Sequence, residues 1–335
     1  MSIIKVAVDA MGGDNAPAAI VKGAVEAVNK IDNLAVILVG KEEPVKEELA
    51  HYRYDDGRLS VVNATQVIGF NEHPAIAVKK KTDSSITVGM KMVRSGDADA
   101  FVSAGSTGAL LVGGIAYIGR IKGIERTPLA TLIPTEKGAS LLIDCGANVD
   151  ARPSHLVQFA KMGSLYMENI CGTNSPKVGI VNIGAEEEKG NALVKETFPL
   201  LKECGAINFV GSVEARDIPK GNADVIVCEA FAGNIILKLY EGLAGTLLKK
   251  IKAGMMSTFL SKIGAGLAKK AIKNTLKSFD VSEYGGAPLL GLKGLVVKTH
   301  GSSTNIEIFN SIKQCVAYVE NDINSKIKNM LSEEM

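Results

Sequence analysis

The feature that most constrains the fold is an uncharged stretch of twenty residues, Ala100 to Gly119, which lies between Asp99 and Arg120. Its length alone would permit a membrane-spanning helix, which needs roughly 20 predominantly apolar residues. Glycines and hydroxyl side chains interrupt the apolar pattern, so that 100–104 has the character of a short buried strand and the segment from Gly108 that of a helix. The pattern therefore predicts a strand, a turn and a helix.

The predicted turn between that strand and helix has the composition of an anion-binding site. Backbone N–H groups and the positive end of the helix dipole converge at such a turn, and glycine lets an anion approach the backbone closely. We therefore expect it to hold a phosphate or an oxyanion, and the candidate ligands are Ser103, Gly105, Ser106, Thr107 and Gly108. The alternative is a turn whose small residues serve packing alone.

Segments with strand character alternate with amphipathic helical segments along the whole chain. The expected strands are 3–8, 35–39, 59–62, 100–103, 139–143, 177–183, 207–210, 223–228 and 294–298, and the clearest helices are 18–29, 84–94, 156–170 and 192–203. Such alternation predicts an α/β fold with a mostly parallel sheet covered by helices. No composition break divides the chain, so we expect a single catalytic unit over 1–335, whose length also allows two lobes.

Composition and charge exclude several classes of protein. The net charge is only +2, so the chain as a whole lacks the strong positive charge that is typical of proteins that bind nucleic acid. The five cysteines are scattered without a C-x-x-C pair, as in proteins with reduced thiols, and the start of the chain reads as a strand instead of a signal peptide. We therefore expect a cytoplasmic protein. The four histidines do not cluster with cysteines or acids, so no metal site is predicted.

Five of the predicted strands lead into turns rich in glycine and polar residues. These turns are 9–17, 144–150, 182–191, 228–234 and 300–305. Ligands of parallel sheets gather at the carboxyl ends of the strands, so we expect the turns to line one rim of one sheet, a surface suited to a small anion. His300 begins the last of these turns, and a lone histidine there is either structural or catalytic.

The run from Gly242 to Phe279 contains eight lysines and no acidic residue. Its apolar residues recur at helical spacing and Gly264 to Gly266 offers a bend, which together predict a basic amphipathic helical hairpin over 243–280. Such helices bind a membrane surface or an acidic partner, and the alternative is a core or dimer helix pair with a solvated lysine face. If a tip near 257–266 meets an anionic membrane surface, the expected contacts are Phe259, Leu260, Lys262, Ile263, Lys269 and Lys270.

Several motifs occur in order along the chain: DAMGGDNAP at 9–17, SAGSTGALL at 103–111, DCGANVDARPSHLVQFAKMG at 144–163, NIGAEEEKGN at 182–191, and YGGAPLLGLKG with KTHGSS within 284–303. In this order they resemble the bacterial phosphate acyltransferases of phospholipid synthesis, which are acyl-acyl carrier protein:phosphate acyltransferases. The resemblance covers essentially the whole chain. Two departures are Ser106, where the family usually has Asn, and Glu229, where the family usually has Asp.

The resemblance implies an isocitrate/isopropylmalate dehydrogenase-like α/β fold, a homodimer, and peripheral association with the cytoplasmic membrane. It also implies that inorganic phosphate attacks the thioester of a long-chain acyl-acyl carrier protein, which gives an acyl phosphate for a downstream glycerol-3-phosphate acyltransferase. No metal or redox cofactor is required, because phosphate dianion is itself a nucleophile. The site must position two reactants and stabilise the tetrahedral oxyanion.

Roles for individual residues follow from placing this reaction on the polar turns. We expect phosphate or the oxyanion to bind at 103–108 and at the turn that begins with His300, with the further ligands Gly301, Ser302 and Ser303. Lys189 and Asn234 are candidates for polarising the carbonyl or easing departure of the thiolate, and Asp9 and Asn182 for orienting the site. Lys189 could also be an ordinary exposed lysine.

Three rival functions have different requirements. A decarboxylating NAD-dependent dehydrogenase needs a metal-binding aspartate cluster and arginines for a substrate carboxylate, which the sequence does not supply. A membrane-docking scaffold would leave the polar turns without a purpose. A phosphotransacetylase that acts on acetyl-coenzyme A should lack the basic, apolar helical pair.

Overall fold

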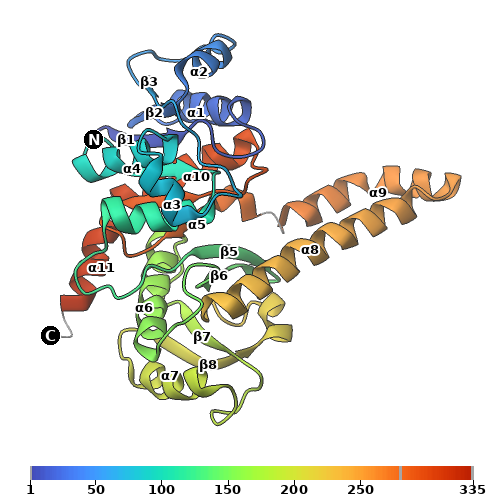
Figure 1. The fold of residues 1–335 in the computed structure, drawn as a ribbon. Coiled ribbons are helices and arrows are strands. Elements are labelled where there is room, and N and C mark those ends of the chain that lie inside the picture. Colours follow the sequence, from blue (N-terminus) through green and yellow to red (C-terminus); the bar gives the residue numbers. More distant parts are fainter. Residues whose placement is uncertain (1, 279–280, 333–335) are drawn as a thin grey trace. The chain divides into compact units, whose positions relative to one another are not determined.

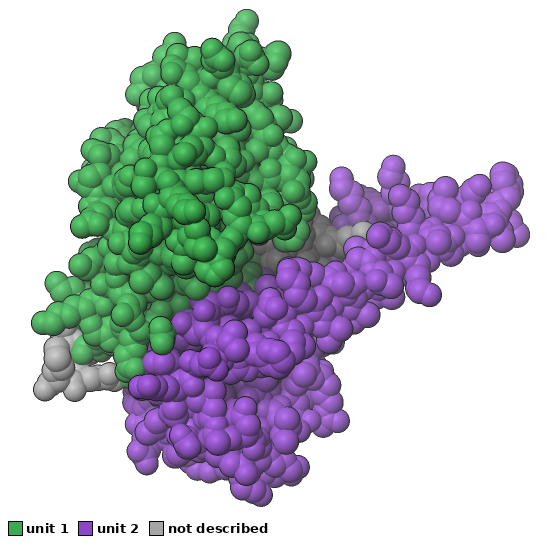
Figure 2. Space-filling view, in the orientation of Figure 1, with its two compact units in different colours: residues 1–131, 161–175, 282–335 green, residues 132–160, 176–281 purple. Residues whose placement is uncertain are grey.

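The computed structural model describes residues 2–278 and 281–332, and the chain forms two compact units (Figure 1, Figure 2). Unit 1 contains residues 1–131, 161–175 and 282–335, and unit 2 contains residues 132–160 and 176–281. Neither unit is one continuous segment, because the chain passes between them repeatedly. A composition break along the sequence is therefore not expected, even though the units are distinct.

Unit 1 is built on a six-stranded sheet with the order β10-β11-β4-β1-β2-β3. Its strands are β1 (Ile4–Asp9), β2 (Leu34–Gly40), β3 (Leu59–Asn63), β4 (Ala100–Ser103), β10 (Ala287–Leu289) and β11 (Leu295–Lys298). The pairs from β11 through β3 are parallel, and β10 runs antiparallel to β11. All four residues of β4 are buried, as expected for a central strand covered on both faces.

The helices of unit 1 are α1 (Ala18–Lys30), α2 (Glu42–Leu49), α3 (Pro74–Lys80), α4 (Ser85–Ser95), α5 (Thr107–Gly113) with a π-helical turn at Gly114–Ile118, α10 (Asn305–Glu320) and α11 (Ile323–Ser332). Side-chain caps mark the start of α4, α5 and α10 among these helices. The Ser84 hydroxyl caps the start of α4, and Gly96, with a φ of +83°, follows its last residue. Thr304 and Glu307 form a capping box at the start of α10.

Unit 2 is built on a five-stranded sheet with the order β5-β6-β9-β7-β8. Its elements are β5 (Ala130–Thr135), β6 (Gly138–Ile143), α6 (Pro153–Ile170), β7 (Lys177–Asn182), α7 (Ala192–Glu203), β8 (Asn208–Glu214), the 3-10 helix Ala215–Lys220, β9 (Val225–Val227), α8 (Ala230–Met255) and α9 (Phe259–Ser278). The 3-10 helix Val281–Tyr284 leads from unit 2 back into unit 1. The pairs from β6 through β8 are parallel. The second half of α6 belongs to unit 1.

The expected α/β architecture of mostly parallel strands covered by helices is confirmed, and so is the strand, turn and helix over 100–119. The expectation of one sheet is wrong, because a chain of this length divides its apolar residues between two cores. Strands β5 and β10 were not expected from the sequence. Both are edge strands, where Pro134 and Pro288 are tolerated and break the pattern that marks a strand.

Helices α8 and α9 lie side by side and extend beyond the sheet of unit 2 (Figure 1). The chain turns between them at 256–258, where the Thr258 hydroxyl accepts the N–H of Ser261 at 3.1 Å. The bend expected at Gly264 to Gly266 is wrong, because a glycine costs a helix only about 1 kcal/mol and its neighbours in α9 are good helix formers. Phe279 and Asp280, at the end of the basic run, lie outside the described residues, as does the side chain of Lys277.

None of the described helices is long and apolar enough to cross a membrane.

Candidate functional site

In each unit, three neighbouring strands end in polar, glycine-rich turns. In unit 1 these strands are β1, β4 and β11, and we call their turns the unit 1 rim: 9–17, 103–108 and 299–304. In unit 2 the strands are β6, β7 and β9, and we call their turns the unit 2 rim: 144–150, 182–191 and 228–234. The single rim expected from the sequence is therefore two rims, one on each sheet.

The turns after β1 and β11 are joined by backbone and amide hydrogen bonds. The N–H of Asp14 donates to the carbonyl of Gly301 at 2.7 Å. The side-chain amide of Asn15 donates to the carbonyls of Ser302 and Ser303, at 3.0 and 3.1 Å. These bonds hold the turn after β11 in a fixed position against the turn after β1.

A buried carboxyl group joins the turns after β1 and β4. The hydroxyl of Ser103 donates to Asp9 at 2.6 Å and accepts the N–H of Gly105 at 2.9 Å, while Met11 donates its N–H to the same carboxyl at 3.1 Å. Burial raises the pKa of Asp9, and hydrogen bonds from Ser103 and Ser85 partly oppose that shift. The expected ligand Ser103 therefore uses its proton to fix the turn.

The unit 1 rim also holds donors that no protein group uses. Within the described residues, no hydrogen bond involves the N–H groups of Gly13, Thr107, Gly108 or Gly301. The hydroxyls of Thr299 and Ser303 are buried without a partner there. Because buried polar groups are nearly always hydrogen-bonded, the two buried hydroxyls favour a ligand at this rim, and the neighbouring unused N–H groups suit an anion.

His300 lies exposed at the start of the same turn. Its Nδ1 accepts the N–H of Ser302 at 3.2 Å and lies 2.8 Å from the Ser302 hydroxyl. Because Nδ1 accepts a backbone N–H, the proton of the neutral ring lies on Nε2. His300 can therefore donate a hydrogen bond from Nε2 to a ligand.

Sequence reasoning missed Thr299 of this rim and Lys298, which directly precedes it. The ammonium of Lys298 donates to the carbonyl of Thr299 and lies 3.3 Å from the carbonyl of Ala104, so it joins the turns after β4 and β11. Both residues stand inside the KTHGSS motif, but Lys298 is the last residue of a strand. A strand pattern gives no signal for a residue whose importance lies in its side-chain partners.

Ser106, one of the two departures from the family pattern, caps helix α5. Its hydroxyl accepts the N–H of Ala109 at 3.4 Å. Asn and Ser are both favoured at this position, so the exchange keeps the cap.

In the unit 2 rim, Asn182 and Lys189 are brought together. The buried amide of Asn182 donates to the carbonyl of Lys189 at 3.2 Å and to the Ser212 hydroxyl at 3.0 Å, which fixes the turn after β7. The Lys189 ammonium is half-exposed and lies 2.7 Å from the carboxylate of Glu186, whose hydrogen bond raises the pKa of Lys189. Lys189 is therefore a charged donor on a defined turn.

The other two turns of the unit 2 rim pack tightly against each other. Asp144 accepts the N–H groups of residues 146–148 at 2.8 to 3.1 Å. Glu229, the second departure, caps helix α8 by accepting two N–H groups of its first turn. A Cβ on Gly233 would lie 1.9 Å from the carbonyl oxygen of Asp144, so only glycine fits there. Asn234 follows and is exposed.

The part of the chain that is described offers no group of three or more His, Cys, Asp or Glu side chains that could hold a metal. Cys145, Cys228 and Cys315 are buried, and burial raises the pKa of each thiol. A thiol with a raised pKa is a poor nucleophile at neutral pH.

Known proteins similar to this chain were found by sequence and by fold. The family model described as fatty acid synthesis protein matches residues 4–326. The phosphate acyltransferase of Clostridium novyi is 47% identical over 332 residues, which are 99% of this chain and 100% of that protein. The phosphate acyltransferase of Clostridium acetobutylicum is 47% identical over 328 residues, which are 98% of this chain and 99% of that protein.

Two solved structures share the fold. The EutD phosphotransacetylase from Staphylococcus aureus matches with a TM-score of 0.63 at 17% identity, over 94% of both chains. A phosphotransacetylase from Streptococcus pyogenes matches with a TM-score of 0.60 at 18% identity, over 95% of this chain and 94% of that one. At such identities the likeness shows the fold alone.

Proposed function

The chain belongs to the fatty acid synthesis protein family, and we propose that it transfers a long-chain acyl group from the thioester of an acyl-acyl carrier protein to inorganic phosphate. Its relatives named phosphate acyltransferase support transfer to phosphate. The observation that carries the proposal for the site is the set of unused donors on the unit 1 rim, above all the buried hydroxyls of Thr299 and Ser303.

The reaction requires little covalent chemistry from the protein. One phosphate oxygen forms a bond to the thioester carbonyl carbon, and the carbonyl oxygen becomes a tetrahedral oxyanion. The carbon–sulfur bond then breaks, the carrier leaves as a thiolate that takes up a proton, and acyl phosphate remains. Fixed N–H and O–H donors lower the barrier because they hold the phosphate and stabilise the oxyanion without reorganising.

The unit 1 rim supplies the donors in this proposal. Phosphate is bound by the Gly301, Ser302 and Ser303 turn, by Nε2 of His300, and by the N–H groups of Thr107 and Gly108. Asp9, Ser103, Gly105 and Ser106 orient these groups through the hydrogen bonds described above. Lys298 is a positioning residue that keeps two of the turns together.

The unit 2 rim carries the other candidate residues for this reaction. Lys189 polarises the carbonyl or eases departure of the thiolate, with Asn182 fixing the turn that carries it. Asn234 has the same candidate role from the first turn of α8.

The test uses two buried serines that differ in their partners. The Ser303 hydroxyl has none among the described residues, whereas the Ser311 hydroxyl donates to the carbonyl of Glu307 at 2.7 Å. Ser303→Ala should raise the KM for phosphate about tenfold, which corresponds to about 1.4 kcal/mol, without loss of stability. Ser311→Ala should lower stability by about 1 kcal/mol and leave that KM unchanged.

The assay follows acyl phosphate formed from palmitoyl-acyl carrier protein. An unchanged KM for phosphate in Ser303→Ala would remove the unit 1 rim from the phosphate site. Acyl phosphate formed only from acetyl-coenzyme A would favour the phosphotransacetylase alternative.

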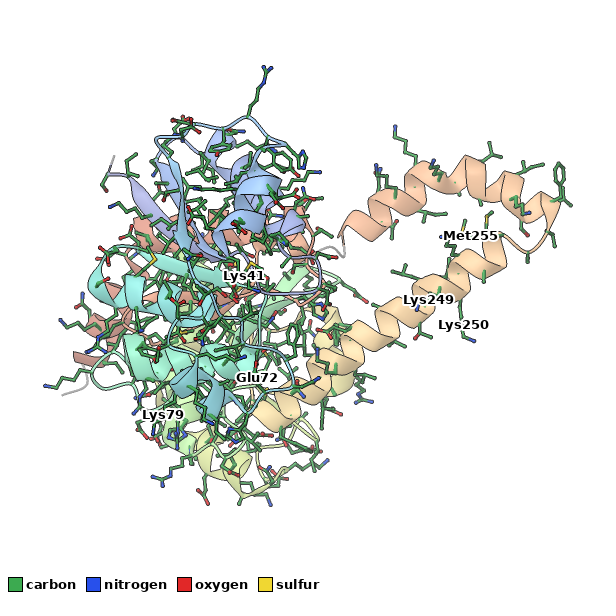
Figure 3. All side chains as sticks on the ribbon, turned by 45° about the horizontal axis from the view of Figure 1, so that its top comes forward. Lys41, Glu72, Lys79, Lys249, Lys250 and Met255 are labelled. Atoms are coloured by element: carbon green, nitrogen blue, oxygen red, sulfur yellow. The ribbon has the colours of Figure 1, made fainter. Side chains whose placement is uncertain are left out.

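We propose a peripheral membrane role for the α8 and α9 pair. Phe259, Leu260 and Leu267 are 78%, 80% and 85% exposed, and Lys262, Lys269 and Lys270 are exposed on the same helix. Figure 3 shows Lys249 and Lys250 on α8, in the part of the helix that leads to Met255, its last residue. Burying each large apolar side chain contributes roughly 1.5 to 3 kcal/mol, and each lysine near anionic lipid about 1 kcal/mol. These magnitudes suit reversible docking of a cytoplasmic protein.

Flotation with anionic vesicles tests the docking. Phe259→Asp and Ile263→Asp should lose flotation, whereas Thr246→Asp on α8 adds the same charge without removing an apolar side chain and should float. If Ile263→Asp floats as well as the unchanged chain, the membrane role is wrong, and the lysines of α8 and α9 are better explained as a binding surface for the acidic acyl carrier protein.

The proposal has three further parts. The chain forms a homodimer, which sedimentation analysis tests. Its fold belongs to the isocitrate/isopropylmalate dehydrogenase-like class. Its product is consumed by a glycerol-3-phosphate acyltransferase that uses acyl phosphate.

A further inference from the structure

The segment that follows β3 runs along the unit 1 rim. The N–H of Ala64 donates to the carbonyl of Gly40 at the end of β2, and the N–H of Ser85 donates to the carbonyl of Gln66. Between these points Pro74 lies against the turn after β4, because a Cβ on Gly108 would be 2.6 Å from its ring. The segment 66–74 therefore borders the proposed phosphate site.

Phe70 stands on this segment directly beside the turn after β11. Its Cζ atom lies 3.4 Å from the position that a Cβ of Gly301 would occupy, and Asp14 lies on the same side at 3.6 Å. The ring nevertheless remains 54% exposed. An aromatic side chain thus lies at the edge of a set of polar donors.

The loop that carries Phe70 is braced by an ion pair. Glu72, labelled in Figure 3, accepts the N–H of Gly69 at 2.6 Å and the ammonium of Lys81 at 2.7 Å. Lys81 also donates to the carbonyl of Val67 at 2.7 Å. Phe70 is therefore presented by a loop whose two ends are fixed.

A single exposed apolar side chain is ordinary on a protein surface. Phe70 differs from such residues because it lies beside the proposed phosphate site. In the attacking geometry the thioester carbonyl carbon approaches a phosphate oxygen to about 3 to 3.5 Å, so the first methylenes of the acyl chain must also lie within a few ångström of the phosphate. A phosphate site for this donor therefore needs an apolar surface at its edge.

We propose that Phe70 binds the first methylenes of the acyl chain and thereby positions the thioester for attack. This inference rests on the proposed function of the unit 1 rim. The phenyl ring offers neither donor nor acceptor, which suits methylenes. The other arm of the thioester, the pantetheine of the carrier, has amide groups that need hydrogen-bonding partners.

The two products separate these arms in the experiment, because acyl phosphate carries the chain without pantetheine and free carrier protein carries pantetheine without the chain. In Phe70→Ala, kcat/KM for palmitoyl-acyl carrier protein should fall about tenfold, and the inhibition constant of palmitoyl phosphate should rise about tenfold, which corresponds to about 1.4 kcal/mol. The inhibition constant of holo-acyl carrier protein and the KM for phosphate should stay within about twofold. Phe70→Leu should restore most of the loss.

Ile76→Ala is the matched control, because Ile76 is 51% exposed on α3, close in sequence to Phe70. It should behave as the unchanged chain. An equal rise in the inhibition constant of holo-acyl carrier protein would place Phe70 against the pantetheine arm, and unchanged constants for both products would remove it from the site; either result overturns the inference. A failure of the proposed function itself is recognised separately, because the unchanged chain would then form no acyl phosphate.

Discussion

The substitution Gly233→Ala tests the packing that holds the start of α8 against the turn after β6. A Cβ at Gly233 would lie 1.9 Å from the carbonyl oxygen of Asp144 and 2.9 Å from its carbonyl carbon. The turn cannot move away easily, because the Asp144 side chain accepts the N–H groups of three following residues. The new methyl group must therefore push the helix outward.

The magnitude follows from two opposing effects. Alanine favours a helix over glycine by about 1 kcal/mol, whereas overpacking costs about 1 to 3 kcal/mol and occasionally more. A contact of 1.9 Å with backbone lies at the severe end, so we expect a net loss of about 2 kcal/mol or more. Gly242→Ala, in the same helix, meets no described atom within 4 Å and should instead gain about 0.5 to 1 kcal/mol.

Hydrogen exchange followed by mass spectrometry measures the opening free energy of unit 2 directly. Peptides that cover β6 and β9 should exchange faster in Gly233→Ala and no faster in Gly242→Ala, and Gly233→Ala should also lose activity because Asn234 moves with the helix. Equal exchange in the two variants would refute the packing argument.

Two further predictions concern the rims. Burial raises the pKa of Asp9, so its contribution to stability is complete below the unfolded pKa of about 3.8 and is lost as the pH rises through the folded pKa. Asp9→Asn should therefore gain stability relative to the unchanged chain as the pH rises from about 4 to about 7 in urea unfolding. Lys189→Ala and His300→Ala should each lower kcat/KM at least about tenfold with unchanged thermal unfolding. Unaltered rates would make both residues structural.

The elements that the sequence predicted well are those with a strong local pattern. The helix 192–203 and the buried strand 100–103 have the expected bounds, because helical periodicity and a continuous apolar run depend on neighbouring residues only. The division into two sheets depends on which strands pair, for example β11 with β4, and no local pattern contains that information. The bend expected at Gly264 to Gly266 is wrong for a different reason. The two glycines indicate a bend locally, but the neighbouring residues of α9 favour helix and keep it continuous.

At the candidate site, too, the sequence does not reveal contacts between residues that are far apart in the chain. Ser103 was expected to bind an anion, but its hydroxyl donates to Asp9, which lies 94 residues earlier in the chain. The roles of Thr299 and Lys298 depend on the fold: the Thr299 hydroxyl is buried without a partner among the described residues, and the Lys298 ammonium lies 3.3 Å from the carbonyl of Ala104, far away in the sequence. Turn composition indicated where polar groups gather, whereas the roles of individual groups required the tertiary structure.

The central claim is that phosphate itself is the nucleophile, held by fixed donors. Mixing the protein with palmitoyl-acyl carrier protein, with and without phosphate, and weighing every species by mass spectrometry tests it most directly. If phosphate is the nucleophile, free carrier appears only with phosphate and the mass of the protein never changes. The raised pKa values of the buried Cys145, Cys228 and Cys315 thiols, which make them poor nucleophiles, agree with this prediction. Release of one equivalent of carrier without phosphate, together with a protein heavier by one palmitoyl group, would contradict the account.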